Sequence, residues 1–262
     1  MNMKQLVKIK NRIYANYFMP SRLEEYKSIL KNVIESGYTI ITVRDYYKGL
    51  LNNTLNGKYF INRHDIDTIP TSAKEMFEIE KSLGVKGTYY FRLSTIDIEL
   101  MKEIRTYGSE ASYHFEELAQ YAKDNHIKSK DKVLEDIEKI REIFIKNFLE
   151  LERKLGYKME TVCSHGDFVN RQLKCINYEI TNSKELRQKL GILCEAYDKD
   201  LKDHTLYTTD APYPKFWNPI DVRELIGKGD VIYMLTHARH WKKNIIRNTM
   251  EDLKRFYEGY TW

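Results

Sequence analysis

Two aspartates that are two residues apart open the strongest chemical signal in this sequence. The segment YFINRHDIDTIP, residues 59–70, begins as an apolar run and then brings His64, Asp65 and Asp67 together before Pro70. On a regular strand Asp65 and Asp67 would point to one face and His64 to the other. Carboxylates this close repel, so either one takes a proton or both share a cation. A metal bound by one carboxylate, with the other left as a base, would resolve the repulsion. A solvated D-x-D that opens a loop and caps a following helix is the alternative.

Three histidines stand at the ends of similar apolar runs. His114 lies in SEASYHFEEL with Glu116 close behind, His165 lies in CSHGD, and His237 lies in YMLTHARHW. Imidazole together with a carboxylate is the ligand set of a catalytic zinc or similar ion that keeps open positions for water and substrate. A histidine also suits a general acid that protonates a leaving group. Because a lone histidine is more often a structural hydrogen-bonding residue, only their convergence would give these residues a chemical role.

The elements that must position these residues can be read from the hydropathy pattern. Short runs rich in β-branched and aromatic residues predict strands at 38–43, 59–65, 87–93, 110–115, 160–166, 192–198, 206–211 and 231–237. Helical periodicity is clearest over 131–155, and a second helix is expected from Pro70 to Gly84. This alternation predicts parallel strands joined by helices, hence a (β/α) barrel or an open doubly wound sheet.

The polar residues show a second regularity, because they fall at or just past the carboxyl ends of the predicted strands. Besides the residues above, the set contains Arg92, Asp198 and Asp210. In both candidate folds the carboxyl ends of the strands share one face, where ligand sites form. We therefore expect segments that are distant in the sequence to converge on one cleft.

Composition limits the class of protein. With 262 residues, 42% of them hydrophobic, and no Pro- or Gly-rich linker, the chain is expected to form a single domain over residues 1–262. The 43 basic and 38 acidic residues are mixed along the chain, which argues against a nucleic-acid partner. No run approaches the roughly 20 apolar residues of a membrane span. No export signal is evident at the start, so the cytoplasm is the expected location.

Several segments, taken in order, resemble the polysaccharide deacetylase family, which is carbohydrate esterase family 4 with its NodB-homology fold. They are RHDIDTIP, GVKGTYYFR, SYHFEEL, SHGDFVNR, EAYD, YTTDAPYPKFW and LTHARHW, and together they span roughly residues 20–245. They are most similar to a bacterial branch that reads RHDVD…P, G-x-x-TYFFR, GYHYE, HGS and LTHPxxW. The resemblance implies an α/β fold, a distorted (β/α) barrel of about seven parallel strands. It also implies hydrolysis of an N-acetyl group, or a related amide or ester, on an amino sugar with the help of a divalent metal.

The resemblance also implies roles for individual residues. Asp65 would be the general base and Asp67 a metal ligand, although the intervening Ile66 leaves room for the two carboxylates to exchange roles. His114 matches the first histidine of the family's His-x-x-x-His metal pair, and His237 matches the general acid. Substrate-binding residues are implied at Arg92, Asp210 and Trp217.

One departure from the family pattern affects the metal site directly. The second histidine of the metal pair falls at Leu118, which cannot bind a metal, so Glu116 and His165 are the candidates for the missing ligand. Ser109, Ser112 and Ala238 also differ from the branch.

We therefore expect a metal-dependent hydrolase, with Zn preferred over Ni, Co or Mn. It would remove an acyl group from a small carbohydrate, a cytoplasmic intermediate of surface-polysaccharide metabolism. The alternative is a catalytically silent barrel that binds a carbohydrate or a protein partner through the same cleft.

Overall fold

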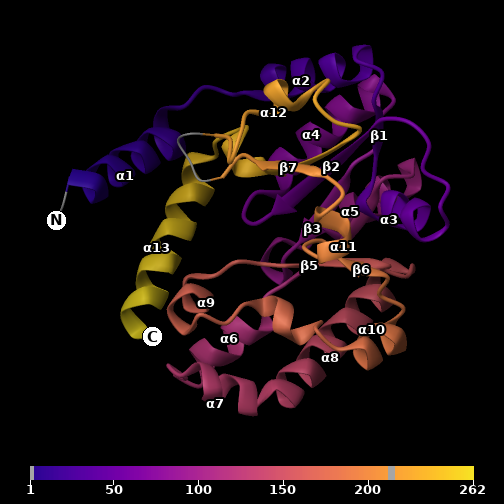
Figure 1. The fold of residues 1–262 in the computed structure, drawn as a ribbon. Helices are drawn as coiled ribbons and strands as arrows, with labels where there is room; N and C mark the ends of the chain where they lie inside the picture. The colour runs from indigo at the N-terminus through magenta and orange to yellow at the C-terminus, as the bar shows by residue number, and fades with distance from the viewer. Residues whose placement is uncertain (1–2, 212–215) are drawn as a thin grey trace.

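The computed structural model describes residues 3–211 and 216–262, and its centre is a curled sheet of parallel strands covered by helices (Figure 1). The strands are β1 (Thr39–Ile41), β2 (Tyr59–Ile66), β3 (Thr88–Phe91), β4 (Glu110–Phe115), β5 (Thr161–Ser164), β6 (Cys194–Glu195), β7 (Leu206–Thr209) and β8 (Val231–His237). They lie in the order β6-β5-β4-β3-β2-β8-β7, and β1 pairs with β2 off this path. Each predicted strand is found, and the predicted distorted parallel barrel of about seven strands is confirmed. Among the described residues β6 and β7 do not pair, so the barrel stays open between them.

Helices connect successive strands and cover the outside of the sheet. They are α1 (Met3–Ile13), α2 (Leu23–Glu35), α3 (Val43–Leu51), α4 (Pro70–Leu83), α5 (Ile98–Tyr107), α6 (Glu117–Asp124), α7 (Lys130–Glu135), α8 (Ile137–Leu155), α9 (Phe168–Leu173), α10 (Lys184–Leu190), α11 (Lys199–Lys202), α12 (Val222–Leu225) and α13 (Ile245–Thr261). The predicted helix at Pro70 is α4, and it ends at Gly84, whose φ of +69° favours glycine. The predicted helix over 131–155 is divided at Asp136 into α7 and α8.

The alternation of side chains along β2 explains how one strand serves both a core and a site. Phe60 and Ile66 belong to the larger apolar cluster, which the sheet shares with the covering helices. Ile61 belongs to a second, smaller cluster inside the curl, which includes Tyr90 and Tyr233. Since side chains alternate along a strand, Arg63 and Asp65 share the inner face with Ile61.

The register brings the carboxyl ends of the strands together. Asp65 pairs with His237 on β8 and with Tyr90 on β3, and His114 on β4 pairs with Cys163 on β5. The first half of β2 is covered by β1 and the second half by β3 on the same edge. The predicted convergence of strand ends is therefore built into the sheet.

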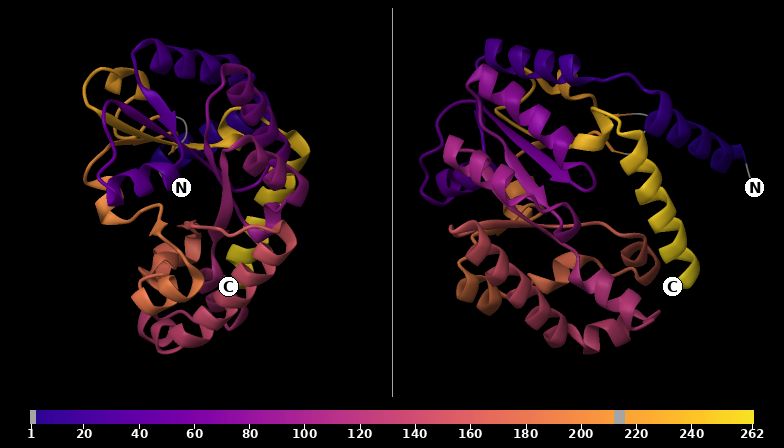
Figure 2. Two further views of the ribbon diagram at one scale, coloured as in Figure 1. Left: turned by 90° about the vertical axis from the view of Figure 1, so that its right-hand side faces the viewer. Right: turned by 180° about the vertical axis from the view of Figure 1, so that it is seen from behind.

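The N-terminal region and α13 lie together beside the sheet (Figure 2). Asn248 of α13 donates to the carbonyl of Asn16 at 3.2 Å, and Asp252 pairs with Arg12. Trp262, which follows α13, contacts α6: its indole N–H donates to the carbonyl of Ala122 at 3.1 Å. None of the described helices combines the length and apolar character needed to cross a membrane. The single domain over residues 1–262 stays a prediction, and residues 1–2 and 212–215 of that range lie outside the described residues.

Candidate active site

Asp65 is buried and held by the strand that carries it. Arg63 lies two residues earlier on β2, and its Nε and Nη2 donate to Asp65 Oδ1 and Oδ2 at 2.9 and 2.7 Å. Both side chains are almost completely buried, at 0% and 2% exposure. Burial alone would raise the pKa of Asp65, but Arg63 and then His114 outweigh it, so the pKa is lowered. Asp65 is therefore an ionised carboxylate of fixed orientation at neutral pH.

His114 presents one ring nitrogen to both aspartates. Its Nδ1 lies 3.0 Å from the carbonyl oxygen of Cys163, which can only accept, so Nδ1 carries a proton. Its Nε2 lies 3.5 Å from Asp65 Oδ2 and 3.3 Å from Asp67 Oδ1. Burial lowers the pKa of His114, yet Asp65 and Asp67 raise it above the ordinary value overall. The carboxylates therefore favour a positive charge between themselves and this ring.

His165 reaches the same point from β5. Its backbone N–H donates to the carbonyl of Phe115 at 2.8 Å, which continues the pairing with β4 one residue past the strand. Its Nδ1 lies 3.1 Å from Glu116 Oε2, so this nitrogen donates and Nε2 is left facing Asp67 Oδ1 at 3.7 Å. Burial, followed by the guanidinium of Arg92, keeps the pKa of His165 below its ordinary value despite the nearby carboxylates. A neutral imidazole is the form that binds metals.

Glu116 lies on the Nδ1 side of His165, opposite the Nε2 atom that faces Asp67. Its carboxylate accepts three hydrogen bonds from Arg92, at 2.7 to 3.1 Å, and a fourth from His165. Burial would raise the pKa of Glu116, but His165 and Arg92 lower it far below the ordinary value. A carboxylate that orients a histidine in this way is the usual outer partner of a metal ligand. Of the two candidates for the missing ligand, the geometry favours His165 and gives Glu116 the orienting position.

The donor set of Asp67, His114 and His165 fits a divalent metal. Their ligand atoms lie within 4.8 Å of one another. Asp67 Oδ1 is buried and accepts no hydrogen bond, although two imidazole nitrogens face it. Because the Nδ1 atoms of both histidines are committed as donors, each Nε2 is the atom that faces Asp67. The raised pKa of His114 shows that the carboxylates stabilise a positive charge at this point, which a proton on His114 Nε2 supplies and a divalent ion bound by the deprotonated ring would replace.

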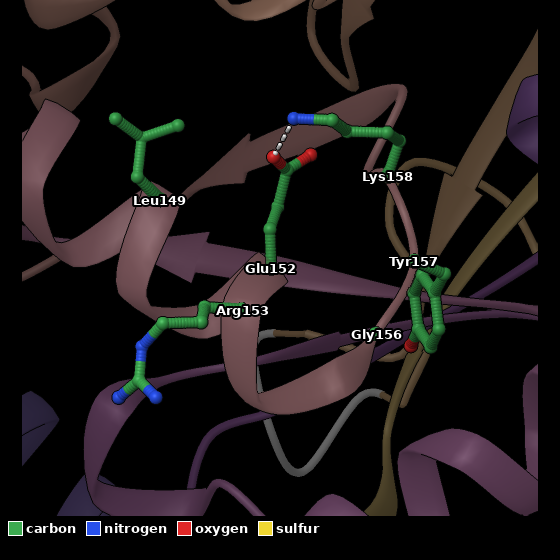
Figure 3. A pocket seen from close by; sticks show the side chains of 6 residues that line it. All are labelled: Leu149, Glu152, Arg153, Gly156, Tyr157 and Lys158. Carbon is green, nitrogen blue, oxygen red and sulfur yellow. Dashed lines mark hydrogen bonds and ion pairs between the residues drawn. The ribbon is translucent and has the colours of Figure 1, made fainter.

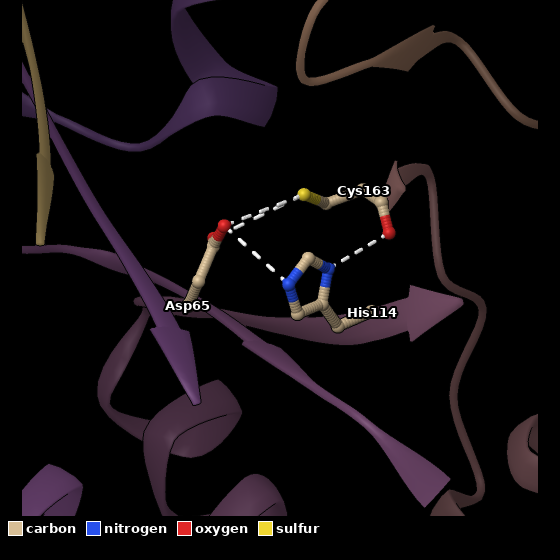
Figure 4. A group of neighbouring side chains, drawn as sticks. All are labelled: Asp65, His114 and Cys163. Carbon is tan, nitrogen blue, oxygen red and sulfur yellow. Dashed lines mark hydrogen bonds and ion pairs between the residues drawn. The ribbon is translucent and has the colours of Figure 1, made fainter. Parts of the chain in front are cut away.

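A second group of potential ligands, Asp65, His114 and Cys163, lies slightly deeper (Figure 4). Cys163 is a buried thiol, and burial raises its pKa well above the ordinary value. The guanidinium of Arg63 lies 2.7 Å from the Cys163 sulfur and occupies both oxygens of Asp65. A cation at this place would meet that guanidinium, so Asp67 is the better placed aspartate for a metal.

His237 stands on the next strand end beside its own carboxylate. Asp210 Oδ1 accepts from His237 Nδ1 at 2.7 Å, and Asp210 Oδ2 accepts from the backbone of His237 and from the indole of Trp241. Burial lowers the pKa of His237, but Asp210 more than compensates and raises it to about 9. His237 is thus an imidazolium at neutral pH, with Nε2 as the remaining donor.

The three predicted substrate residues fall into different environments. Arg92 holds Glu116 and donates to the carbonyl of Asp67 at 3.1 Å, and its guanidinium also lines a hollow next to the site. Asp210 is fully buried and serves His237. Trp217 is buried to 7% exposure, with its ring 6.0 Å from that of Trp241. Residues 212–215 of the segment that carries Asp210 and Trp217 lie outside the described residues.

Three positions singled out in the sequence lie apart from this group. Leu118 is fully buried on α6 and packs in the larger apolar cluster. Asp198 binds Arg187 through both of its carboxylate oxygens and accepts from the Tyr178 hydroxyl. His64 faces outward, where it bonds Glu80 at 2.7 Å.

Sequence reasoning missed two residues that the structure adds to the site. Arg63 had a readable signal, because a residue two positions before Asp65 shares its face of the strand. His240, whose Nδ1 lies 3.3 Å from Asp210 Oδ1, had none, because it sits in the short turn after β8. It adds a second imidazole to the carboxylate that serves His237.

Two hollows accompany this arrangement. One of about 290 Å³ begins at Asp67 and His165 and extends to α13. The other, of about 330 Å³, lies at the end of α8 and includes Glu152, Tyr157 and Lys158 (Figure 3). It precedes β5 and therefore belongs to the amino ends of the strands. Its Glu152 is committed to Lys158 and to the backbone of Met159, which leaves the first hollow as the candidate substrate site.

Comparisons with known proteins give structural likenesses only. No family model and no curated protein matches the chain. Similar solved structures include IcaB from Ammonifex degensii (TM-score 0.47, 14% identity, covering 66% of this chain and 77% of that one). A second is the Streptococcus pyogenes deacetylase PplD in complex with acetate (0.42, 15%, 66% and 74%). A third is a CE4 esterase from Streptococcus mutans (0.43, 14%, 86% and 90%). Likenesses of this strength carry no argument about activity, so the fold rests on the strand order and the function on the geometry of the site.

Proposed function

We propose that this chain is a metal-dependent hydrolase that removes an acetyl or related acyl group from an amino sugar or a similar amide. The observation that carries the proposal is the convergence of Asp67, His114 and His165 on one point. A buried carboxylate and an imidazolium stand on the adjoining strand ends, which supports acid–base chemistry at the same place. The resemblance of the strand-end segments to polysaccharide deacetylases supports the choice of an acylated sugar.

Three residues are proposed to bind the metal, and a fourth to orient one of them. Asp67, His114 and His165 would hold the ion, with Glu116 fixing the ring of His165. When bound, a divalent ion, for which we prefer Zn over Ni, Co or Mn, supplies Lewis acidity at the acyl carbonyl.

Asp65 is proposed as the general base. Arg63 keeps its carboxylate ionised and oriented, so it can take the proton that the attacking water loses.

His237 is proposed as the general acid. It is protonated at neutral pH and donates from Nε2 to the nitrogen of the departing amine, while Asp210 stabilises the charged ring. Positioned acids and bases each contribute about 10²–10⁴-fold in rate.

The experiment that tests the proposal separates metal binding from turnover. Purified protein is analysed for Zn, Ni, Co and Mn, and acetate release is measured with a panel of N-acetylated amino sugars. We expect about one ion per chain, lost in His114→Ala and His165→Ala. Asp65→Asn should retain the ion and lose at least 100-fold in rate.

The alternative is a catalytically silent barrel that binds a carbohydrate or a protein partner in the same cleft. The absence of bound metal, together with an acetate release rate unchanged by Asp65→Asn, would favour that alternative and contradict the hydrolase.

We place the enzyme in the cytoplasm, where it would act on an intermediate of surface-polysaccharide metabolism. A fluorescent fusion and fractionation of the cells would test this location.

A further inference from the structure

Helix α13 exposes a continuous apolar stripe. Its exposed large apolar residues are Ile245, Ile246, Met250, Leu253, Phe256, Tyr257 and Tyr260. At 3.6 residues per turn these positions all lie on one side of the helix. The one buried residue of α13 is polar, Asn248, which bonds the backbone of Asn16. The amphipathic character of α13 is therefore inverted relative to that of a helix that packs on an apolar core.

The N-terminal segment, which consists of α1 and the turn of π-helix at Tyr14–Phe18, has the same inverted character. It contacts α13 through polar groups: Asn16 Nδ2 donates to Asp252 Oδ2 at 2.7 Å, and the Tyr17 hydroxyl lies 3.1 Å from Thr249 Oγ1. Both helices lie on the same side of the molecule (Figure 2). Apolar surface gathered in this way, unlike single exposed residues, marks an interaction site. The exposed apolar residues of the segment are Leu6, Val7, Ile9, Ile13, Tyr14 and Phe18.

Positive charge accompanies this apolar surface. Residues 1–22 contain five basic residues and no acidic one, so the rest of the chain contains 38 of each sign and the net charge of +5 lies in this segment. Arg12 and Arg22 are paired with carboxylates. Lys10 and Arg247 are exposed and form no ion pair with any residue that the structure describes. A basic amphipathic segment of this kind is typical of helices that lie on an anionic membrane surface.

The other side of α13 faces the candidate active site. Glu251, Lys254, Arg255 and Glu258 line the hollow that begins at Asp67. Their spacing of three and four residues places them on one side of the helix, away from the apolar stripe. One helix thus connects the candidate site with the exposed apolar surface.

We propose that the protein docks on the surface of an anionic phospholipid membrane through the exposed apolar faces of α1 and α13. The helices would lie in the plane of the interface, with the apolar side chains among the acyl chains and the basic side chains at the headgroups. A second copy of the chain would bring two basic segments against each other, whereas anionic lipid neutralises them. The inference goes beyond the proposed function and does not depend on it. Docking would hold the mouth of the hollow at the membrane.

The test compares the protein's partition onto two kinds of vesicle, measured by sedimentation. One kind contains phosphatidylcholine alone, and the other also contains phosphatidylglycerol. We expect the partition coefficient to be roughly ten-fold or more higher with phosphatidylglycerol, and the difference to shrink as salt is raised. Lys10→Gln with Arg247→Gln should weaken binding to the anionic vesicles and leave binding to the neutral ones unchanged.

A second pair of substitutions tests the apolar face. Leu253→Gln with Phe256→Gln should lower the partition coefficient roughly ten-fold or more. Because both side chains are exposed in the free protein, at 64% and 76%, the Tm, the metal content and acetate release from soluble sugars should not change. Ile143→Gln with Leu149→Gln, an exposed apolar pair on α8, is the matched control and should bind vesicles like the parent protein.

Three results would overturn the proposal. They are equal partition onto neutral and anionic vesicles, equal effects of the α13 and α8 pairs, and a dimer without vesicle binding. For the dimer, analytical ultracentrifugation would show dissociation by Leu253→Gln with Phe256→Gln, which would assign the apolar face to a second copy of the chain. Vesicle binding by a protein that holds no metal would contradict the hydrolase and leave the docking surface standing.

Discussion

At the scale of the residue, the proposed base, the proposed acid and one proposed metal ligand are each paired with a second group that sets its charge or its orientation. Arg63 holds Asp65 ionised, Glu116 orients His165, and Asp210 keeps the ring of His237 protonated. Arg63 and Asp210 are buried and the Glu116 side chain is only 14% exposed, so their charges act with little screening. The pairs explain how acid and base remain in their working forms at neutral pH.

The pairing of Asp210 with His237 predicts the alkaline limit of activity. Because the pKa of His237 is raised to about 9, the acid is protonated below that pH, and kcat/KM should fall as the pH rises through about 9. Asp210→Asn removes the negative charge and should move this limb toward the ordinary histidine value of roughly 6.5. A pH profile of both proteins, at equal metal content, checks the shift. An unmoved limb would rule out His237 as the acid.

At the scale of the element, the alternation of side chains along β2 places the proposed base on one face of the strand and a structural histidine on the other. Arg63 and Asp65 face the inside of the curl, whereas His64 faces the helices. There His64 bonds Thr236 at 2.6 Å and Glu80 at 2.7 Å. The conspicuous histidine of the opening motif is therefore a structural residue, as its direction on the strand predicts.

Loss of His64 should affect stability rather than metal binding. His64→Ala removes one of the hydrogen-bond partners of the fully buried Glu80, which keeps those to Tyr26 and Asn62, and the loss of a buried hydrogen bond costs about 1–3 kcal/mol. Denaturant unfolding should show this loss, while the folded fraction retains its ion. Loss of the ion with unchanged stability would show that His64 belongs to the site instead.

Placing a histidine four residues after His114, on α6, should not create a metal ligand. Leu118 packs in the apolar cluster and is fully buried, so Leu118→His places a polar ring in that cluster at a cost of about 1–3 kcal/mol. We expect the double variant Leu118→His with His165→Ala to remain metal-free. Leu118→Met, a volume-conserving control, should cost less than about 1.5 kcal/mol. Recovery of stoichiometric metal in the double variant would contradict the placement of His165.

The strands and helices could be predicted from the sequence more completely than the roles of the site residues. Apolar runs such as 59–65 and 231–237 predict strands, because the buried, β-branched pattern can be recognised from the residues of each run alone. The choice between Glu116 and His165 could not be made in this way. It depends on Arg92, which comes from another strand, occupies the carboxylate and leaves the imidazole free. Likewise, Asp210 becomes the partner of His237 only through the register of β7 against β8.

At the scale of the whole molecule, the candidate ligands come from three strands, so metal binding and folding should be linked. An ion that binds only the folded state at a thousand times its Kd adds roughly 4 kcal/mol. For a chain of 262 residues this corresponds to a rise in Tm on the order of 10 °C. Differential scanning fluorimetry with and without a chelator measures the shift. His114→Ala should melt at one temperature in both conditions, and an equal chelator effect in that variant would place the ion elsewhere.

The pairing of β2 has a consequence for how the molecule opens. Its backbone is hydrogen-bonded on both edges, by β8 over residues 59–65 and by β1 and β3 over residues 59–61 and 63–66, whereas β5 is held on its outer side by only two register pairs with β6. Amide hydrogen exchange should therefore be slowest in β2 and faster in β5. The aspartates would stay in place during a partial opening that releases His165, so the ion would leave by the β5 side while the sheet remained folded.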